Sequence, residues 1–269
     1  MAKYFEMKVG NTTVRAELLT KEAPKICRAF QRSLPVKSFG VNAKFAGDET
    51  IAMLPFYADH ENLVGSVSPG DIGYYPTRQT LCVFYGKIMP FAGVTLFARV
   101  VPDDLKKSQE VGKQILEAGS LPMTISLPGK STRAPATTTS DIKAVSILDQ
   151  ALKKVWETEP REVKELRSFK RPPMGNVPCV MYANFDLFWA TENLLTAREL
   201  AQDGLTASQA GTVTAALIRR SKSRIAHWGF DEASTVLERT AEEVEKMRSR
   251  KQVIETIDAT VLYIDRLQS

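Results

Sequence analysis

The stretch YFEMKVGNTTVRAELLTKEAPKICRAFQRSL, residues 4–34, decides the fold, because two strand patterns are followed at once by a helix pattern. Apolar and polar residues alternate in YFEMKV and in TVRAEL, and the GNT between them is a tight-turn signal. From Lys21 onward the apolar residues recur at helical spacing, with Pro24 in the first turn. A single helix after the first hairpin, among many short strands, favours a closed or nearly closed barrel.

The two halves of the chain differ in the period of their apolar residues. The first half predicts further strands over residues 39–46, 49–54, 73–75, 81–85, 94–101 and 122–127, and one helix over 103–118. Beyond residue 140 the period is helical, which predicts helices over 141–157, 179–202, 206–227, from 231, and 253–267. The expected N-caps are Thr206 and Asp231 in this half, and Asp103 and Asp104 for the helix over 103–118. The expected fold class is therefore α+β, a β-barrel followed by an all-α helical bundle.

The joint between the halves, LPGKSTRAPATTTSD (residues 127–141), contains the letters of a phosphate-binding loop. A Walker A loop needs a glycine five residues before Gly129, and Thr124 stands there instead. The composition is that of a linker. We expect a barrel domain over 1–127, a linker over 128–140 and a helical bundle over 141–269.

Composition excludes several classes of protein. With 43% hydrophobic and 25% charged residues, the chain is typical of soluble globular proteins, and the lack of a long apolar run or signal core predicts a cytoplasmic protein without membrane contact. Three cysteines and two histidines predict neither a disulfide framework nor a metal site.

Charge is uneven along the chain. Through Pro135 there are 17 Lys+Arg against 12 Asp+Glu, whereas the remainder is balanced. Lys and Arg do not cluster among aromatic residues, so nucleic-acid binding is not expected. The excess is either a scattered solvated surface or a site for small anionic substrates.

The stretch PGDIGYYPTRQTLCVFYG, residues 69–86, gathers the densest set of functional side chains: Tyr74, Tyr75, Arg78 and Tyr85. Strand alternation puts one of the two adjacent tyrosines inward and the other outward. They either close one end of the barrel, or supply phenol donors and a guanidinium that binds a carboxylate.

Two further segments offer polar side chains. In NAKFAGDE, residues 42–49, the ammonium group of Lys44 is either solvated or an anion anchor beside Asn42. In the bundle, an aromatic stripe typical of a core includes Trp189 and has Asp186 and Glu192 on its margin.

Residues 3–127 resemble the bacterial cyclophilin-like domains. The similarity lies in VRAELLTKEAPKICRAFQRSLP, in VTLFARVV followed by PDDLKKSQEVGKQI, and in the GD-x-x-YYP and FYG motifs of one subgroup. The Phe-His-Arg strand and the Gln and Gly-Gly-Asp elements of prolyl isomerases have no counterpart beyond NAK, so isomerase activity is not expected.

The whole chain resembles the cucumopine and mikimopine synthases, with FWATENLLTARELAQDGLTASQAGTVTAALIRRSKSRIAHWGFDEA (residues 188–233) matching their C-terminal bundle. The resemblance implies condensation of L-histidine with 2-oxoglutarate in a Pictet–Spengler cyclisation, with no cofactor, and the bundle is a possible homo-oligomer contact. The alternative is a non-catalytic cyclophilin-like protein that binds a small molecule or a peptide.

Residue type, rather than the resemblance, suggests roles for this chemistry. We expect Tyr74 or Tyr85 to donate a proton or to orient the substrate, and one carboxylate to be the base. The carboxylates considered are Glu17, Glu49, Asp186 and Glu192. The expected substrate-binding residues are Asn42, Lys44, Tyr75, Arg78, Arg99 and Trp189.

Overall fold

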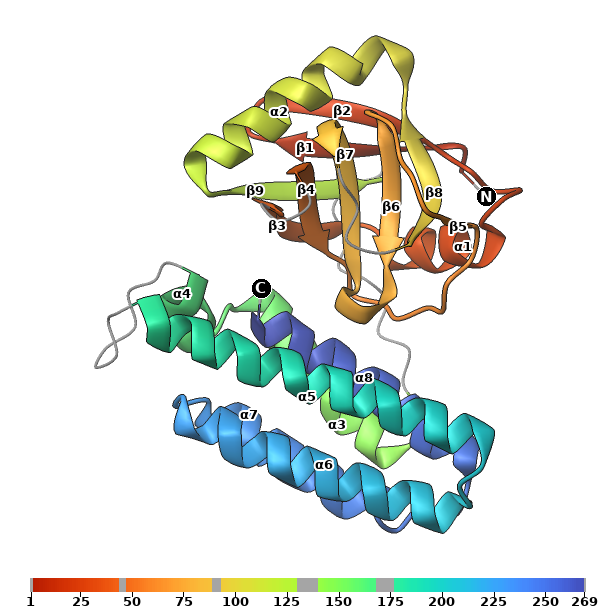
Figure 1. Ribbon diagram of the computed structural model, residues 1–269, viewed down its shortest axis with the longest axis vertical. Coiled ribbons are helices and arrows are strands. Elements are labelled where there is room, and N and C mark those ends of the chain that lie inside the picture. Colours follow the sequence, from red (N-terminus) through yellow and green to blue (C-terminus); the bar gives the residue numbers. More distant parts are fainter. Residues whose placement is uncertain (1, 44–46, 89–92, 130–139, 168–176, 269) are drawn as a thin grey trace. The chain divides into compact units, whose positions relative to one another are not determined.

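A computed structural model of the protein describes residues 2–43, 47–88, 93–129, 140–167 and 177–268. The chain divides into two compact units, Met1–Ala136 and Thr137–Ser269. The predicted α+β class is confirmed: a β-barrel is followed by helices (Figure 1). Lys44, and most of the segment predicted as a linker, lie outside the described residues. In the described ranges every helix is too short or too polar to cross a membrane.

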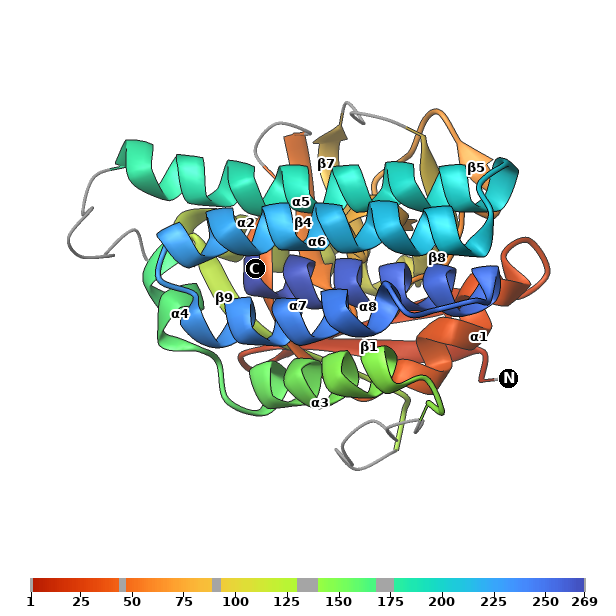
Figure 2. The same ribbon diagram turned by 90° about the horizontal axis from the view of Figure 1, so that it is seen from below.

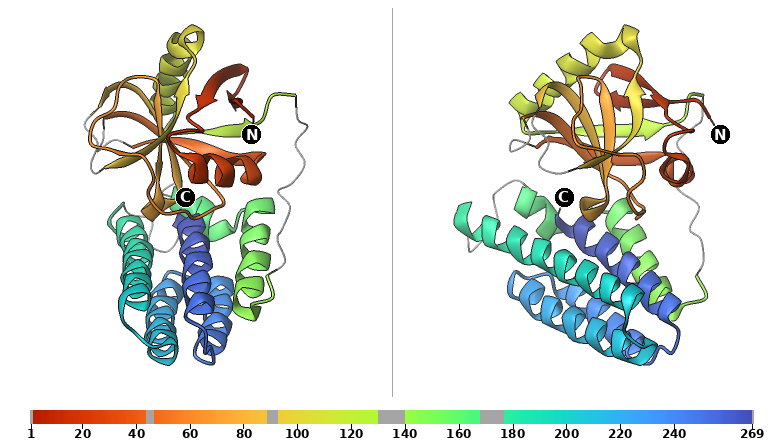
Figure 3. Two further views of the ribbon diagram at one scale, coloured as in Figure 1. Left: turned by 90° about the vertical axis from the view of Figure 1, so that its right-hand side faces the viewer. Right: turned by 45° about the vertical axis from the view of Figure 1, so that its right-hand side comes forward.

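The first unit is an antiparallel barrel (Figures 1 and 3). Its strands are β1 (Tyr4–Val9), β2 (Thr12–Leu18), β3 (Val36–Asn42), β4 (Gly47–Met53), β5 (Leu63–Val64), β6 (Asp71–Tyr75), β7 (Thr80–Ile88), β8 (Val94–Val100) and β9 (Ser120–Ser126). They are ordered β2-β1-β9-β3-β4-β7-β6-β8-β5. A further pairing of β2 with β8 closes the ring, and β5 pairs with β8 beside it.

The opening hairpin and helix form as the sequence predicts. Val9 pairs with Thr12 across a two-residue turn, and Gly10 takes a positive φ of 56° that suits glycine. The helix α1 (Pro24–Ser33) has its proline in the first turn as predicted, but it begins at that proline and not at Lys21. A carboxylate oxygen of Glu61 accepts hydrogen bonds from two backbone N–H groups in the first turn, at 2.8 and 3.1 Å, where a negative charge is favoured.

Side chains from both helices of this unit pack onto the inward faces of the strands. Phe30 of α1 lies edge-on to Phe5 and Phe97, with ring centroids 4.7 and 5.1 Å apart. The second helix, α2 (Leu105–Ala118), packs Ile115 so close to Gly40 that a Cβ there would lie 2.7 Å from it. The barrel interior is therefore filled by side chains.

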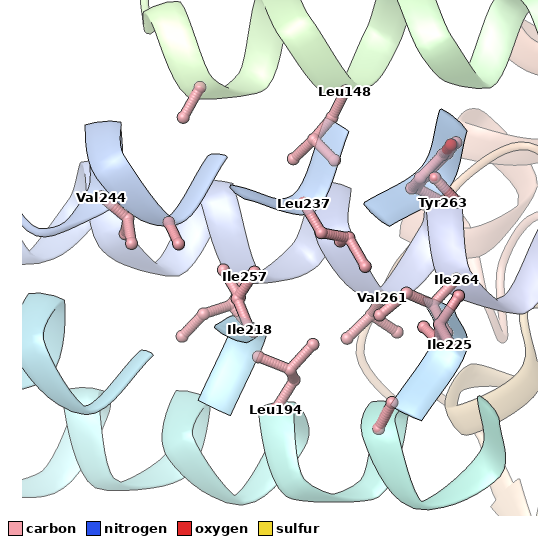
Figure 4. Packing of buried hydrophobic residues seen from close by; sticks show 14 of the residues in the cluster. Leu148, Leu194, Ile218, Ile225, Leu237, Val244, Ile257, Val261, Tyr263 and Ile264 are labelled. Carbon is pink, nitrogen blue, oxygen red and sulfur yellow. The ribbon is translucent and has the colours of Figure 1, made fainter. Parts of the chain in front are cut away.

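The second unit is a bundle of helices (Figure 2). The helices are α3 (Lys143–Glu157), α4 (Arg161–Arg167), α5 (Val177–Asp203), α6 (Ala207–His227), α7 (Asp231–Val244) and α8 (Arg250–Gln268). α8 packs against α3, α5 and α6. Leu194, Ile218, Leu237 and Ile257 meet in the shared core (Figure 4). Each is fully buried.

The helix ends correct part of the sequence reading. Thr206 caps α6 as predicted, because its hydroxyl accepts from the N–H of Gln209, whose side chain accepts from Thr206 in return. Asp231 does not cap α7: it is the first helical residue, and Phe230 holds the cap position. Asp104 precedes α2 without a side-chain cap, since its carboxylate binds the backbone N–H of Arg15 at 2.9 Å. The short helix α4 was not predicted.

The bundle core gives the first prediction. Leu237→Ala removes a fully buried side chain and should lower the free energy of unfolding of this unit by about 2–5 kcal/mol. Leu200→Ala, at a leucine that is 49% exposed, is the matched control and should change it by less than about 0.5 kcal/mol. All three tryptophans lie in this unit, so urea unfolding followed by tryptophan fluorescence reports on it alone. Equal effects of the two substitutions would contradict the described packing.

Candidate active site

Tyr74 and Tyr75 point to opposite faces of β6, as strand alternation predicts. Tyr74 is fully buried and faces inward. Its hydroxyl donates to the carbonyl of Phe56 at 2.9 Å and accepts from the N–H of Ala58 at 3.3 Å, and its ring stacks on Phe56 at 4.9 Å. Tyr74 therefore fastens the segment that follows β4 to the barrel. Tyr75 is half-buried on the outward face.

The outward faces of β4, β7, β6 and β8 carry a second apolar cluster. In the register of these strands, Cys82 of β7 lies between Ile51 of β4 and Gly73 of β6. Thr80 of β7 lies opposite Tyr75 of β6. We call this surface the outer patch; it comprises Glu49, Ile51, Tyr75, Thr80, Cys82, Phe84 and Val94. Val67 and Ile88 pack against its apolar members. The patch is thus an outward face whose apolar side chains are packed together and largely buried.

Glu49 is a buried carboxyl group in the outer patch, opposite Phe84 and 6% exposed. Burial raises the pKa of Glu49, and a hydrogen bond from the thiol of Cys82 partly opposes the rise. The pKa of the Cys82 thiol is itself raised by burial, so it stays protonated and able to donate. The Cys82 sulfur lies 3.8 Å from the hydroxyl oxygen of Thr80. A carboxyl group in such surroundings is suited to proton transfer nearer neutral pH.

Asn42 and Tyr85 meet on the inward face, beneath α2. The side-chain amide of Asn42 donates to the Tyr85 phenol oxygen at 2.8 Å. Burial, and then the charge of Asp48, raise the pKa of Tyr85, so the phenol stays neutral. Its ring packs so closely on α2 that a Cβ at Gly112 would lie 2.4 Å from it. This pair and Glu49 therefore lie on opposite faces of the sheet.

Glu17 and Arg99 face each other on β2 and β8. Each already holds an opposite charge: Glu17 lies 3.2 Å from the ammonium group of Lys3, and the Arg99 Nε donates to Asp71 at 2.8 Å. Arg78 is half-buried in the short 3-10 turn Pro76–Arg78 after β6. Arg99 is therefore an oriented guanidinium on the outer surface of the barrel.

In the bundle, Asp186 and Trp189 line a groove of about 300 Å³ between α5 and α6, which lie side by side in Figure 2. The Asp186 carboxylate accepts from Arg224 at 2.5 Å and from the Trp228 indole at 2.8 Å. Trp189 is 55% exposed, which is unusual for a residue predicted in a core stripe. Arg220 also lines the groove, whereas Glu192 does not.

Sequence reasoning missed Cys82, Arg220 and Arg224. Cys82 stands on the same strand face as Thr80 and Phe84, a signal available in the alternation of LCVFYG. The two arginines recur four residues apart on α6, which places them on one helix face. Among the described residues, no three His, Cys, Asp or Glu side chains gather as metal ligands would.

Comparison with known proteins defines the class of the first unit. The Cyclophilin-like family model matches residues 3–117, which comprise strands β1 to β8 and most of α2 and leave out strand β9. The protein is thus an α+β protein with a cyclophilin-like barrel followed by a helical bundle. A search of curated proteins found no match.

Among solved structures, the protein is similar to McbB, whose structure was determined in complex with tryptophan. The similarity covers 98% of this chain and 94% of McbB, at a TM-score of 0.81 and 17% identity, and it shows a shared fold. The hypothetical protein AF2241 from Archaeoglobus fulgidus matches 46% of this chain and 93% of its own, at 21% identity and a TM-score of 0.36.

The buried carboxyl of Glu49 predicts how stability depends on pH. Because its pKa is higher in the folded protein than in the unfolded chain, the folded state holds the proton more tightly. Stability therefore falls as pH rises above the unfolded value of about 4.3, until the pH passes the folded pKa. Glu49→Gln lacks this titration, so the barrel of the variant should gain stability relative to wild type across that window.

The measurement is urea unfolding followed by circular dichroism, from pH 4 to pH 8. Glu117→Gln, on the exposed face of α2, is the matched control and should follow wild type at every pH. The bundle transition, followed by tryptophan fluorescence, should be the same in all three proteins. A constant difference between Glu49→Gln and wild type at all pH values would contradict the raised pKa.

Proposed function

We propose that the protein is a Pictet–Spengler enzyme that condenses L-histidine with 2-oxoglutarate to cucumopine or mikimopine. The observation that carries this proposal is the similarity to McbB along 98% of the chain, together with the tryptophan bound there. Tryptophan and histidine both carry an α-amine and a nucleophilic aromatic ring carbon in one molecule. A Pictet–Spengler cyclisation requires that combination in its amine substrate.

The reaction balances without any oxidant or reductant. The amine of histidine adds to the ketone of 2-oxoglutarate, and the resulting hydroxyl group takes a proton and leaves as water. The iminium ion that remains is attacked by an imidazole carbon, which forms the new carbon–carbon bond. That ring carbon then loses its proton and aromaticity is restored. One water is released in all, and no hydride is transferred.

Glu49 is suited to both proton transfers. Its raised pKa favours a carboxylic acid that gives its proton to the departing hydroxyl group. The carboxylate left behind stabilises the iminium charge and then takes the proton from the imidazole carbon. The acid is thereby restored, so a single carboxyl group serves the whole cycle. Tyr75 lies on the same outward face and is the phenol best placed to orient a substrate there.

The three carboxylates of the condensed intermediate need cationic partners. Arg99 meets this need on the barrel surface, because Asp71 engages its Nε and fixes the orientation of the guanidinium. Arg78, at the end of the strand that carries Tyr75, is the second guanidinium we assign to carboxylate binding. Lys44, predicted as a third, lies outside the described residues.

The alternative is a non-catalytic protein that binds a small molecule or peptide. The exposed rings of Phe185 and Trp189 on α5 favour it, because large exposed aromatics mark binding surfaces and need no acid or base. The two functions differ in their dependence on Glu49, since binding at α5 does not use it.

The test is to incubate the purified protein with L-histidine and 2-oxoglutarate, without NADH, and to follow the adduct by mass spectrometry. We expect a product equal in mass to the two substrates less one water. Glu49→Gln should lower kcat by about 10²–10⁴-fold, the usual size of a general acid–base effect, with little change in KM. Glu117→Gln should leave kcat unchanged.

Two outcomes would overturn the proposal. The first is a wild-type rate no higher than the spontaneous reaction, and the second is a Glu49→Gln variant that is fully active. In wild type, kcat should also fall as pH rises through the pKa of Glu49, because the cycle begins from the acid. Any residual activity of Glu49→Gln should lack that dependence.

A further inference from the structure

The barrel unit has a cavity that shares no residue with the outer patch. It is a depression of about 580 Å³ between the start of β1, the exposed face of α1 and the chain that follows β9. Its lining includes three cationic side chains, Lys3, Arg28 and Arg32, and no acidic one. This cavity plays no part in the proposed reaction.

The two arginines are held close together by the helix. Positions four apart lie on one face of a helix, with Cβ atoms about 5–6 Å apart, and like charges there repel. Both side chains are exposed, and within the described ranges neither guanidinium has a hydrogen bond or an ion pair. An anion bound between the two arginines would remove the repulsion and would accept hydrogen bonds from both guanidinium groups.

The walls of the cavity are fixed by contacts of their own. The Gln31 side chain donates to the carbonyl of Ala2 at 2.6 Å, and the N–H of Leu18 donates to the carbonyl of Lys3 at 2.9 Å. These bonds fasten the beginning of the chain to α1 and to β2. The Lys3 ammonium group lies 5.1 Å from the centre of the Tyr4 ring and 3.2 Å from Glu17. The cationic groups thus line a depression whose walls are held in place by hydrogen bonds.

The remaining lining is apolar and narrows the class of ligand. Tyr4, Leu127 and Pro128 present carbon surface beside the two arginines. Inorganic phosphate has no apolar group that could pack against these residues. A dicarboxylate has a methylene chain between its anionic ends that could do so. Each carboxylate can take one guanidinium bidentately, and the chain can lie against the apolar residues.

We infer that this cavity is a binding site for a short-chain dicarboxylate, held at its two ends by Arg28 and Arg32. The inference is independent of the Pictet–Spengler reaction and holds whether or not the protein catalyses it. Three cations in one depression do not form the extended basic stripe that nucleic acid requires, which favours a small ligand.

The test uses succinate, which has no keto group and cannot condense with an amine. Calorimetric titration at low salt should give saturable binding of succinate to wild type, with acetate and inorganic phosphate at least ten-fold weaker. The double variant Arg28→Gln/Arg32→Gln should bind succinate at least ten-fold more weakly than wild type. The variant Arg28→Lys keeps the positive charge but cannot bind a carboxylate with two parallel hydrogen bonds. Its affinity for succinate should lie between those of wild type and the double variant.

The matched control is Lys8→Gln/Lys106→Gln, which removes two exposed positive charges elsewhere on the same unit. It should bind succinate as wild type does, and Glu49→Gln should do so as well. Absence of saturable binding to wild type would overturn the inference, as would full binding by the double arginine variant. If inorganic phosphate bound as tightly as succinate, the assignment of the ligand as a dicarboxylate would be wrong. Circular dichroism checks that every variant is folded.

Discussion

The pairing of β2 with β8 closes the ring of strands, and the placement of every functional group in this unit depends on it. Three residue pairs make the closure, among them Glu17 with Arg99. An eight-stranded ring has an interior just wide enough for side chains to fill, and Phe30 and Ile115 from the two helices help to fill it. A substrate the size of histidine has no room inside. Chemistry on this barrel must therefore use its outer surface.

An outward face is ordinarily polar and wet, yet the outer patch is neither. Phe84 and Cys82 are almost fully buried although they point away from the interior, because residues such as Val67 pack over them. Glu49 shares that burial, and an ionised carboxylate in such a place costs free energy unless it is paired. The described hydrogen bond to the Glu49 carboxyl group comes from the thiol of Cys82, which is a weak donor. An apolar residue would be more stable there, which is the pattern expected of a group kept for its chemistry.

The features predicted from the sequence are those that depend on local periods. The opening hairpin, the helix α1 with a proline in its first turn and the Thr206 cap each follow from a few neighbouring residues. Glu49 was one of four acids that the sequence could not rank, because its place opposite Phe84 depends on the pairing of β4 with β7, which are distant along the chain. The pairing of Arg99 with Asp71 likewise depends on the register of β6 against β8, which no local pattern encodes.

Among the described residues, several arginines fall into two groups, those paired with an acidic side chain and those that are not. Arg99, Arg198 and Arg224 each donate to an aspartate from another element, so their guanidinium groups are oriented by the fold itself. On the barrel surface, a guanidinium held in this way, as that of Arg99 is, is pre-organised for a second carboxylate, because little further side-chain entropy is lost on binding. Arg28 and Arg32 are held by no acid in the described part of the chain. Their mutual repulsion destabilises the free protein slightly, and a dianion is the ligand that relieves it. Within the basic N-terminal half, Arg99 is therefore already paired by the fold, whereas Arg28 and Arg32 are the two arginines to which we assign a dianionic ligand.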